Sequence, residues 1–216
     1  MLHRFGQVYA FFSEEPLTVL EFIEKYLKSF FQKNEHMFKK MNFITPKGLN
    51  VLYFLLVNPM EQFHEREIVR RTGVSVGAVN QILRKLHEAG LVEKDRRGRT
   101  NLYKANLKSP VARQFKILFN VLTLNDLINK VKQVSERIAL FGSCAEGTDV
   151  EDSDIDLFVL TSDTETVQHE VRVYEQKIDR RLSPIIIDSS ELAKMKKRDK
   201  PLYERIVRGI ILWERE

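Results

Sequence analysis

Apolar residues recur at helical spacing through the middle of the chain. The first such segment runs from Pro46 to Val57, and it ends at Asn58-Pro59 because the residue before a proline disfavours a helix. A second, shorter helix is predicted from 63 to 72. It ends at Gly73, since glycine readily adopts the left-handed conformation that closes many helices.

A third helix and a hairpin follow. Ser75 is expected to be the N-cap of this helix and Gly90 to end it, and the apolar face between them consists of Val79, Ile82, Leu83 and Leu86. Residues 91–104 then predict two strands around a basic Arg-Gly turn. Helix, tight turn and helix form the helix-turn-helix pattern, whose second helix can enter the major groove of DNA.

The C-terminal part begins with a different pattern. Residues 135–141 end in a short apolar run that predicts a buried strand, and Gly142-Ser143 then allows a tight turn into a short helix over 144–147. A polar loop leads to a second strand, 154–160. Residues two apart in a strand share a face, so Asp154 and Asp156 should project together while Ile155, Leu157 and Val159 face the core.

The remaining segments continue the alternation of helices and strands. A helix is predicted over 164–177 and a strand over 181–187. Ser189 or Ser190 is expected to cap a helix starting at Glu191, and a last helix over 202–209 precedes a closing strand, 210–213.

Two further amphipathic segments lie outside these patterns. A helix with a stripe of leucine, isoleucine and phenylalanine side chains is predicted from Pro16 to Met41, and a helical connector, with a break near Thr123-Leu124-Asn125, over 110–134. The expected organisation is an N-terminal extension (1–45), a helical and hairpin domain (46–106), a connector (107–134) and a C-terminal domain with a small mixed sheet (135–216). The fold class is α+β.

Charge divides the chain into two unlike parts. Between Met60 and Lys108 there are 11 Lys or Arg against 6 Asp or Glu, whereas Arg137 to Glu216 has 13 against 17. The basic part therefore favours a polyanionic partner, and the acidic part favours metal binding or a solvated surface. The single cysteine, Cys144, excludes an intramolecular disulfide and is interpreted as a small buried side chain.

The sequence also predicts where the protein works. No apolar run is long enough to span a membrane, and the first residues lack the pattern of a cleaved signal. A cytoplasmic protein with no membrane partner is expected. His64 and His87 are interpreted as surface or helix residues rather than metal ligands, because no cysteine or second histidine lies at ligand spacing.

The paired carboxylates and the Gly-Ser turn suggest nucleotide chemistry. Adjacent carboxylates repel each other unless a cation lies between them, and Mg²⁺ prefers oxygen ligands that include substrate phosphates. At Gly142-Ser143, and again at Ser153-Asp154-Ile155-Asp156-Leu157 after a spacer of about ten residues, the chain resembles the nucleotidyltransferase superfamily that includes DNA polymerase beta. It is most similar to the minimal nucleotidyltransferases, and the resemblance covers roughly Glu136 to Trp213.

That resemblance implies two-metal nucleotidyl transfer. It implies that Asp154 and Asp156 hold Mg²⁺ on a nucleoside triphosphate, that Gly142 and Ser143 hold its terminal phosphates, and that a third carboxylate activates the attacking hydroxyl. Two positions depart from the pattern. Ser183 aligns with the third carboxylate, and Cys144-Ala145-Glu146 stands where many relatives carry an arginine.

The middle of the chain resembles the winged helix-turn-helix of many prokaryotic transcription regulators. The residues that carry the likeness are Leu86 to Val92 and the basic hairpin after them, and it covers about Thr45 to Ala105. It implies a DNA-binding dimer whose groove-facing residues are Ser75, Val76, Gly77, Asn80, Gln81 and Arg84. It also implies phosphate contacts from the wing residues Arg96, Arg97 and Arg99.

Three functions agree with these patterns. The first is a transcription regulator that binds double-stranded DNA and whose C-terminal domain binds, or transfers part of, a Mg²⁺–nucleoside triphosphate. The second is an active nucleotidyltransferase that modifies a small molecule or a protein and uses the winged helix for recruitment. The third is a non-enzymatic interaction scaffold built from both domains.

Overall fold

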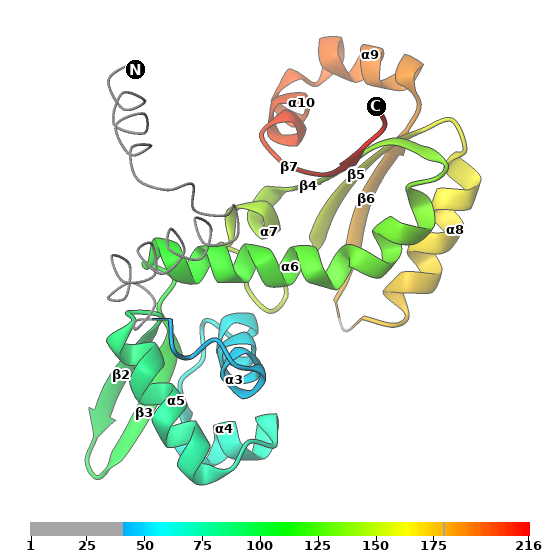
Figure 1. Cartoon of the computed structure of the whole chain (residues 1–216). Coiled ribbons are helices and arrows are strands. Elements are labelled where there is room, and N and C mark those ends of the chain that lie inside the picture. Colours follow the sequence, from blue (N-terminus) through cyan, green and yellow to red (C-terminus); the bar gives the residue numbers. More distant parts are fainter. Residues whose placement is uncertain (1–40, 179) are drawn as a thin grey trace, which may run out of the picture. The chain divides into compact units, whose positions relative to one another are not determined.

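Strand pairing separates the described residues into two sheets, one in the helix-turn-helix region and one in the C-terminal region (Figure 1). The computed structural model describes residues 41–178 and 180–216. The helix predicted from Pro16 to Met41 lies outside these residues except for Met41, which is in a turn. None of the helices in the described residues combines the length and the apolar character that crossing a bilayer requires.

Three helices and a small sheet build the first region. The elements are α3 (Pro46–Val57), β1 (Phe63–His64), α4 (Glu65–Thr72), α5 (Val76–Glu88), β2 (Val92–Arg97) and β3 (Thr100–Ala105). The sheet has the order β1-β3-β2, and both pairings are antiparallel. Apolar faces of the three helices pack against this sheet around Leu52, Leu56, Ile68 and Leu83, which are fully buried. The predicted helix-turn-helix and wing are confirmed.

Residues next to the helix ends explain where α4 begins and ends. Gly73 ends α4 with a φ of +69°, as predicted. The helix begins later than predicted because Phe63 and His64 pair with β3 instead. His64 caps it through Nδ1, which accepts a hydrogen bond from Glu67 N at 3.2 Å. Ser75 holds the N-cap position of α5, but its side chain makes no capping hydrogen bond.

The C-terminal sheet is mixed, as predicted. Its strands are β4 (Ser135–Phe141), β5 (Ile155–Thr161), β6 (Leu182–Ile187) and β7 (Ile210–Glu214), in the order β6-β5-β4-β7. The β5–β6 pair is parallel and the other pairs are antiparallel. In the parallel register Asp156 lies opposite Ser183, and in the antiparallel register it lies opposite Phe141.

Helices cover both faces of this sheet (Figure 1). On one face, α6 (Pro110–Val131) and α8 (Thr164–Glu175) enclose a core that includes Leu140, Ile155 and Leu157. On the other, α9 (Ser189–Arg198) and α10 (Lys200–Val207) pack against Phe141 and Phe158. Both faces of β5 are therefore buried, which explains its nearly continuous apolar sequence.

Two further predictions, a break in α6 and the N-cap of α9, are wrong. Helix α6 is continuous through Thr123. The Thr123 hydroxyl donates a hydrogen bond to Phe119 O, one turn earlier, at 2.9 Å, so this polar side chain has a partner within the helix. Helix α9 is capped by Asp188 rather than by Ser189 or Ser190. The Asp188 carboxylate accepts from the N–H groups of Ser190 and Glu191, both at 2.8 Å, and Glu191 completes a capping box.

Candidate nucleotide site and DNA-binding surface

The turn after β4 brings Gly142 against a carboxylate. Gly142 has a φ of +67° and opens α7 (Gly142–Glu146), a helix of only 5 residues. A Cβ atom at Gly142 would lie 2.1 Å from Asp156 Oδ2, so only glycine leaves room for this carboxylate beside the turn. The Gly-Ser turn and the Asp-x-Asp segment, ten residues apart in sequence, therefore meet in space.

Asp156 occupies an environment that disfavours its negative charge. Burial raises the pKa of its carboxyl group, Arg205 opposes that shift, and the charge of Asp154 adds to it. The Asp156 side chain is 25% exposed, and Asp154 is half-buried just before β5. Two carboxylates that repel each other at a partly open edge fit a divalent cation, which neutralises both.

Ser183 occupies the position predicted for a third carboxylate. It lies on β6 directly opposite Asp156, and residues opposite each other in a sheet project from the same face. Among residues 41–178 and 180–216, no three His, Cys, Asp or Glu side chains cluster to hold a metal ion. The site thus offers two carboxylates, which suffice for Mg²⁺ only together with phosphate oxygens and water.

Sequence reasoning missed Arg205. This α10 residue places Nη2 3.6 Å from Asp156 Oδ2, and its guanidinium lies over the Phe141 ring at 5.7 Å. Its position depends on how α10 crosses β4, which no local pattern reveals. The four-residue spacing of Leu202 and Ile206 predicts only that this face of α10 is buried, and Arg205 lies outside that core.

A buried polar cluster lies behind the turn and was also missed. Asp149 follows α7 and is 1% exposed. Its Oδ2 lies 3.3 Å from Lys116 Nζ and 3.1 Å from Arg180 Nη1. Asn120 donates to Asp149 Oδ1 and to Cys144 O, both at 3.0 Å. These contacts hold α7, through Cys144, and the loop that leads to Asp154, through Asp149.

Cys144 belongs to this cluster and is fully buried, as predicted. Burial and the nearby charge of Asp149 raise the pKa of its thiol to about 11, although Arg180 partly opposes the shift. Arg180 Nη2 lies 3.2 Å from Cys144 Sγ and 2.9 Å from Ser153 O. The thiol is therefore a structural group at this turn rather than a nucleophile.

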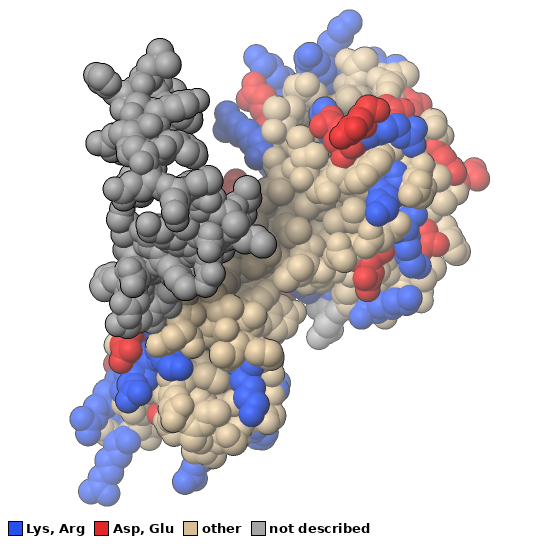
Figure 2. All heavy atoms as spheres, in the orientation of Figure 1, with Lys and Arg blue, Asp and Glu red and all other residues tan. Residues whose placement is uncertain are grey.

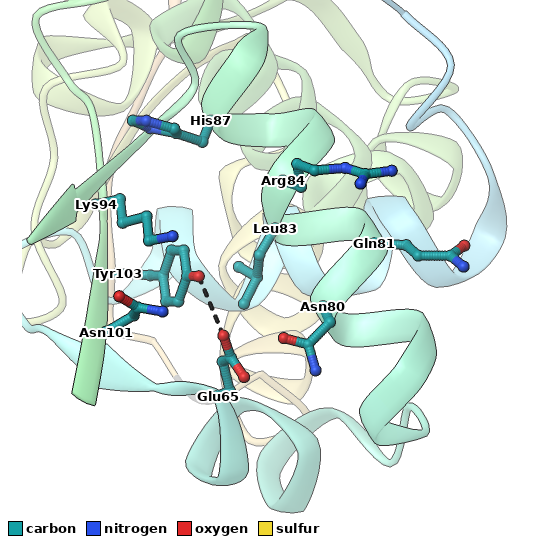
Figure 3. Close-up of a pocket in the computed structure, with 9 residues that line it drawn as sticks. All are labelled: Glu65, Asn80, Gln81, Leu83, Arg84, His87, Lys94, Asn101 and Tyr103. Atoms are coloured by element: carbon teal, nitrogen blue, oxygen red, sulfur yellow. Dashed lines mark hydrogen bonds between the residues drawn. The ribbon is translucent and has the colours of Figure 1, made fainter. Parts of the chain in front are cut away.

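The surface between α5 and the wing contains a cavity of about 350 Å³ (Figure 3). Its lining includes Asn80, Gln81 and Arg84 from α5, and Lys94, Asn101 and Tyr103 from the two strands. Figure 3 shows Gln81 and Arg84 pointing outward from α5 and Tyr103 turned toward Glu65. Tyr103 donates from its hydroxyl to Glu65 Oε1 at 3.1 Å and so joins the wing to α4.

The predicted DNA-contacting residues are all accessible. Ser75, Val76 and Gly77 are exposed at the start of α5, and Asn80, Gln81 and Arg84 are exposed along it. Arg96, Arg97 and Arg99 are exposed at the end of the wing, where basic side chains project in Figure 2. Arg97 is partly engaged within the protein, because its Nη2 donates to Gln62 Oε1 at 2.9 Å.

Two family models match different parts of the chain. Residues 44–99 match the model described as MarR family, and residues 122–216 match the model described as Polymerase beta, Nucleotidyltransferase. Residues 44–99 are therefore similar to MarR-family winged helices, and residues 122–216 are similar to nucleotidyltransferases. No curated protein matches the sequence.

Several solved structures share parts of the fold. NolR from Sinorhizobium fredii is 22% identical over 51% of this chain and 94% of its own, with a TM-score of 0.31. A candidate nucleotidyltransferase from Sulfolobus solfataricus is 16% identical over 51% and 94%, with a TM-score of 0.33. A variant of ZitR from Lactococcus lactis in complex with DNA is 20% identical over 53% and 86%, with a TM-score of 0.32.

Proposed function

We propose that this protein is a transcription regulator that binds double-stranded DNA through α5 and the wing and a Mg²⁺–nucleoside triphosphate at the Gly142 turn. The observation that carries the proposal is the carboxylate of Asp156 at 2.1 Å from the Cβ position of Gly142, in a chain that also exposes a helix-turn-helix. A turn without a side chain beside a carboxylate pair is suited to phosphates and their metal.

Each residue of the nucleotide site has a proposed role. Asp154 and Asp156 would hold Mg²⁺, which supplies charge neutralisation for the triphosphate. Gly142 lets the backbone approach the terminal phosphates, and Ser143 adds its N–H and hydroxyl as hydrogen-bond donors. The core beneath β5 and the buried Asp149 cluster hold these groups in place before a ligand arrives.

The DNA-binding surface divides into two kinds of contact. Asn80, Gln81 and Arg84 have side chains that can read base edges in the major groove, with Ser75, Val76 and Gly77 close to the DNA at the start of α5. Arg96, Arg97 and Arg99 would contact phosphates, which position the protein without reading sequence.

A homodimer would place two recognition helices on two half-sites. The apolar side chains of Val111, Leu118 and Leu122 are exposed on α6 at spacings of seven and four residues, which place them on one face of the helix. Light scattering on the purified protein checks this association, and a monomer at all concentrations would contradict it.

Two titrations test the main proposal. Calorimetry with Mg²⁺ and ATP, CTP, GTP or UTP in turn should show binding that Asp156→Asn abolishes and Arg84→Gln leaves unchanged. Selection of duplexes from a random pool should enrich a sequence that Arg84→Gln binds more weakly and Asp156→Asn still binds. Absence of both nucleotide and DNA binding by the wild-type protein would show that the proposal is wrong.

Nucleotidyl transfer is the second candidate, and the Asp154–Asp156 pair favours it. In that reaction an acceptor hydroxyl oxygen bonds to the α-phosphorus, the bond to the β-phosphate bridging oxygen breaks, and pyrophosphate leaves. The hydroxyl proton needs an acceptor, and Ser183, opposite Asp156, is a poor base.

Transfer of label from α-labelled nucleotides to protein or to a product in cell extract tests this second candidate. Transfer by the wild type that Asp156→Ala abolishes would make the protein an enzyme. Ser183→Asp restores a carboxylate at that position and should raise any transfer rate, whereas an unchanged rate would place the proton acceptor elsewhere.

A further inference from the structure

We propose that Arg205 is a phosphate-binding residue of the nucleotide site, and that it exchanges its ion pair with Asp156 for the triphosphate when Mg²⁺ and nucleotide bind. The inference rests on the proposed nucleotide binding and adds to it a residue from a distant helix. The segment from Gly142 to Asp156 contains no Lys or Arg. Arg205 would supply the positive charge that a triphosphate needs there.

The packing of α10 on the sheet places Arg205 beside the Gly142 turn. Leu202 and Ile206 on the same helix pack against the outer face of the sheet. The guanidinium of Arg205 lies over the Phe141 ring at 5.7 Å, directly before the turn. Its Nη2 lies 3.4 Å from the Cβ position of Gly142 and 3.6 Å from Asp156 Oδ2. A phosphate on the backbone of Gly142 would therefore touch the guanidinium.

The pair with Asp156 is not a structural necessity. The Arg205 side chain is 59% exposed, and the 3.6 Å separation is longer than a hydrogen bond. Ion pairs of this kind contribute little to stability because water screens them. Once a divalent cation neutralises Asp156, the guanidinium loses this partner and can turn to an anion beside it.

Two other cations close to the turn among the described residues, Lys116 and Arg180, already have partners. No Lys or Arg occurs between Gly142 and Asp156 in the sequence. Lys116 and Arg180 lie within 3.3 and 3.1 Å of buried Asp149, and Arg180 is also bonded to Ser153 O. A guanidinium presents several N–H donors in a planar fork that fits phosphate oxygens, so Arg205 has the chemistry that a triphosphate requires.

Calorimetry on the full chain tests this assignment. The ligands are Mg²⁺ with ATP, CTP, GTP or UTP, and Mg²⁺ with inorganic tripolyphosphate, which carries no base. Arg205→Gln should bind the best nucleotide and tripolyphosphate about tenfold more weakly, the loss of one charge-assisted contact. Arg205→Lys should recover part of this affinity because it keeps the charge but not the fork.

Arg172→Gln is the matched control, since it removes the same charge from an exposed position on α8, on the opposite face of the sheet from α10. It should change affinity by less than about twofold, as expected for a distant surface charge. Equal affinities for the wild type and Arg205→Gln would overturn the assignment while leaving nucleotide binding in place. No binding by the wild type would instead remove the proposed function itself.

A measurement on the wild-type protein alone avoids any effect of substitution on folding. Phenylglyoxal modifies exposed arginines, and mass spectrometry reports which ones react. Mg²⁺ with tripolyphosphate should protect Arg205 and leave the reaction of Arg172 unchanged. Equal modification of Arg205 with and without tripolyphosphate, under conditions in which calorimetry shows binding, would contradict the proposal.

Discussion

Lys116 Nζ lies 3.3 Å from Asp149 Oδ2, and both side chains are almost wholly buried, at 3% and 1% exposed. Lys116 also donates to Leu56 O, at the end of α3, at 2.5 Å. One α6 side chain therefore bonds to the winged-helix region and to the loop behind the candidate nucleotide site. Burial lowers the pKa of Lys116, and the neighbouring carboxylate opposes that shift.

Comparing the stability lost on substitution of Lys116 and of Asp149 tests whether this buried cluster stabilises the fold. Lys116→Met leaves Asp149 paired with Arg180, whereas Asp149→Asn leaves buried Lys116 and half-buried Arg180 without a carboxylate partner. We therefore expect Asp149→Asn to cost about 3 to 5 kcal/mol in free energy of unfolding, and Lys116→Met to cost less. Urea unfolding followed by circular dichroism measures both values.

An exposed ion pair provides the control for that experiment. Lys130 Nζ lies 2.7 Å from Glu170 Oε2, but the two side chains are 43% and 26% exposed. Lys130→Met should change the free energy of unfolding by less than about 1 kcal/mol. If Asp149→Asn were no more costly than Lys130→Met, the buried cluster would not stabilise the fold.

Much of the fold could be predicted from local pattern. Apolar periodicity located the helices and strands, and Gly73 ended α4 where expected because a positive φ is easily reached only by glycine. Alternation in the second strand placed Ile155, Leu157 and Val159 in the core, where they are buried. That alternation did not reveal that Phe158, on the opposite face, is also buried. The burial of Phe158 depends on the packing of α9 and α10, which are distant in sequence.

The unpredicted features depend on contacts between distant segments. Arg205 and Asp156 are far apart in sequence, and only the β4–β5 pairing and the packing of α10 bring them together. Lys116 lies in the helical connector and Asp149 in a polar loop, and no sequence pattern links them, so only the structure reveals their pairing. The sequence could propose Ser183 as the third position because a single helix separates strand β6 from strand β5.

The Cys144 thiol should react slowly in the native protein. It is fully buried, and its pKa is raised to about 11, so little thiolate exists at neutral pH and that little is inaccessible. Iodoacetamide followed by mass spectrometry should show little labelling until denaturant is added. Rapid labelling of the folded protein would mean that α7 opens readily and that the turn before it is not preorganised.

Tyr103 should make the winged helix sensitive to alkaline pH. Burial and the charge of Glu65 raise the pKa of its phenol from 10.0 to about 12. The folded state therefore holds this proton more tightly than the unfolded state, so its contribution is complete below pH 10 and is lost as pH rises toward about 12. The free energy of unfolding should fall over this range.

Replacing the phenol isolates that effect. Tyr103→Phe removes the titrating group and should make the decline with pH shallower. Lys94 Nζ, 5.8 Å from the ring centroid, is the other charge close to this ring, so Lys94→Gln controls for a general change of charge. Equal slopes for the wild type and Tyr103→Phe would show that Tyr103 does not carry the alkaline dependence.

The wing arginines should differ in how much each contributes to the salt dependence of DNA affinity. Each phosphate contact contributes about 0.9 to the slope of log affinity against log salt concentration, because counterions are released when it forms. Arg99→Gln should therefore lower the slope by about that amount. Arg97→Gln should lower it by less, since Arg97 already bonds to Gln62 and pairs with Asp95.

Fluorescence anisotropy with one labelled duplex over a range of salt concentrations measures these slopes. Arg172→Gln, which removes an exposed charge on α8, should leave the slope unchanged. Asn80→Ala should change the preference among duplex sequences while the slope stays the same, because a base contact releases no counterion. If Arg99→Gln weakened binding equally at all salt concentrations, Arg99 would not be contacting a phosphate, and the wing would need another role.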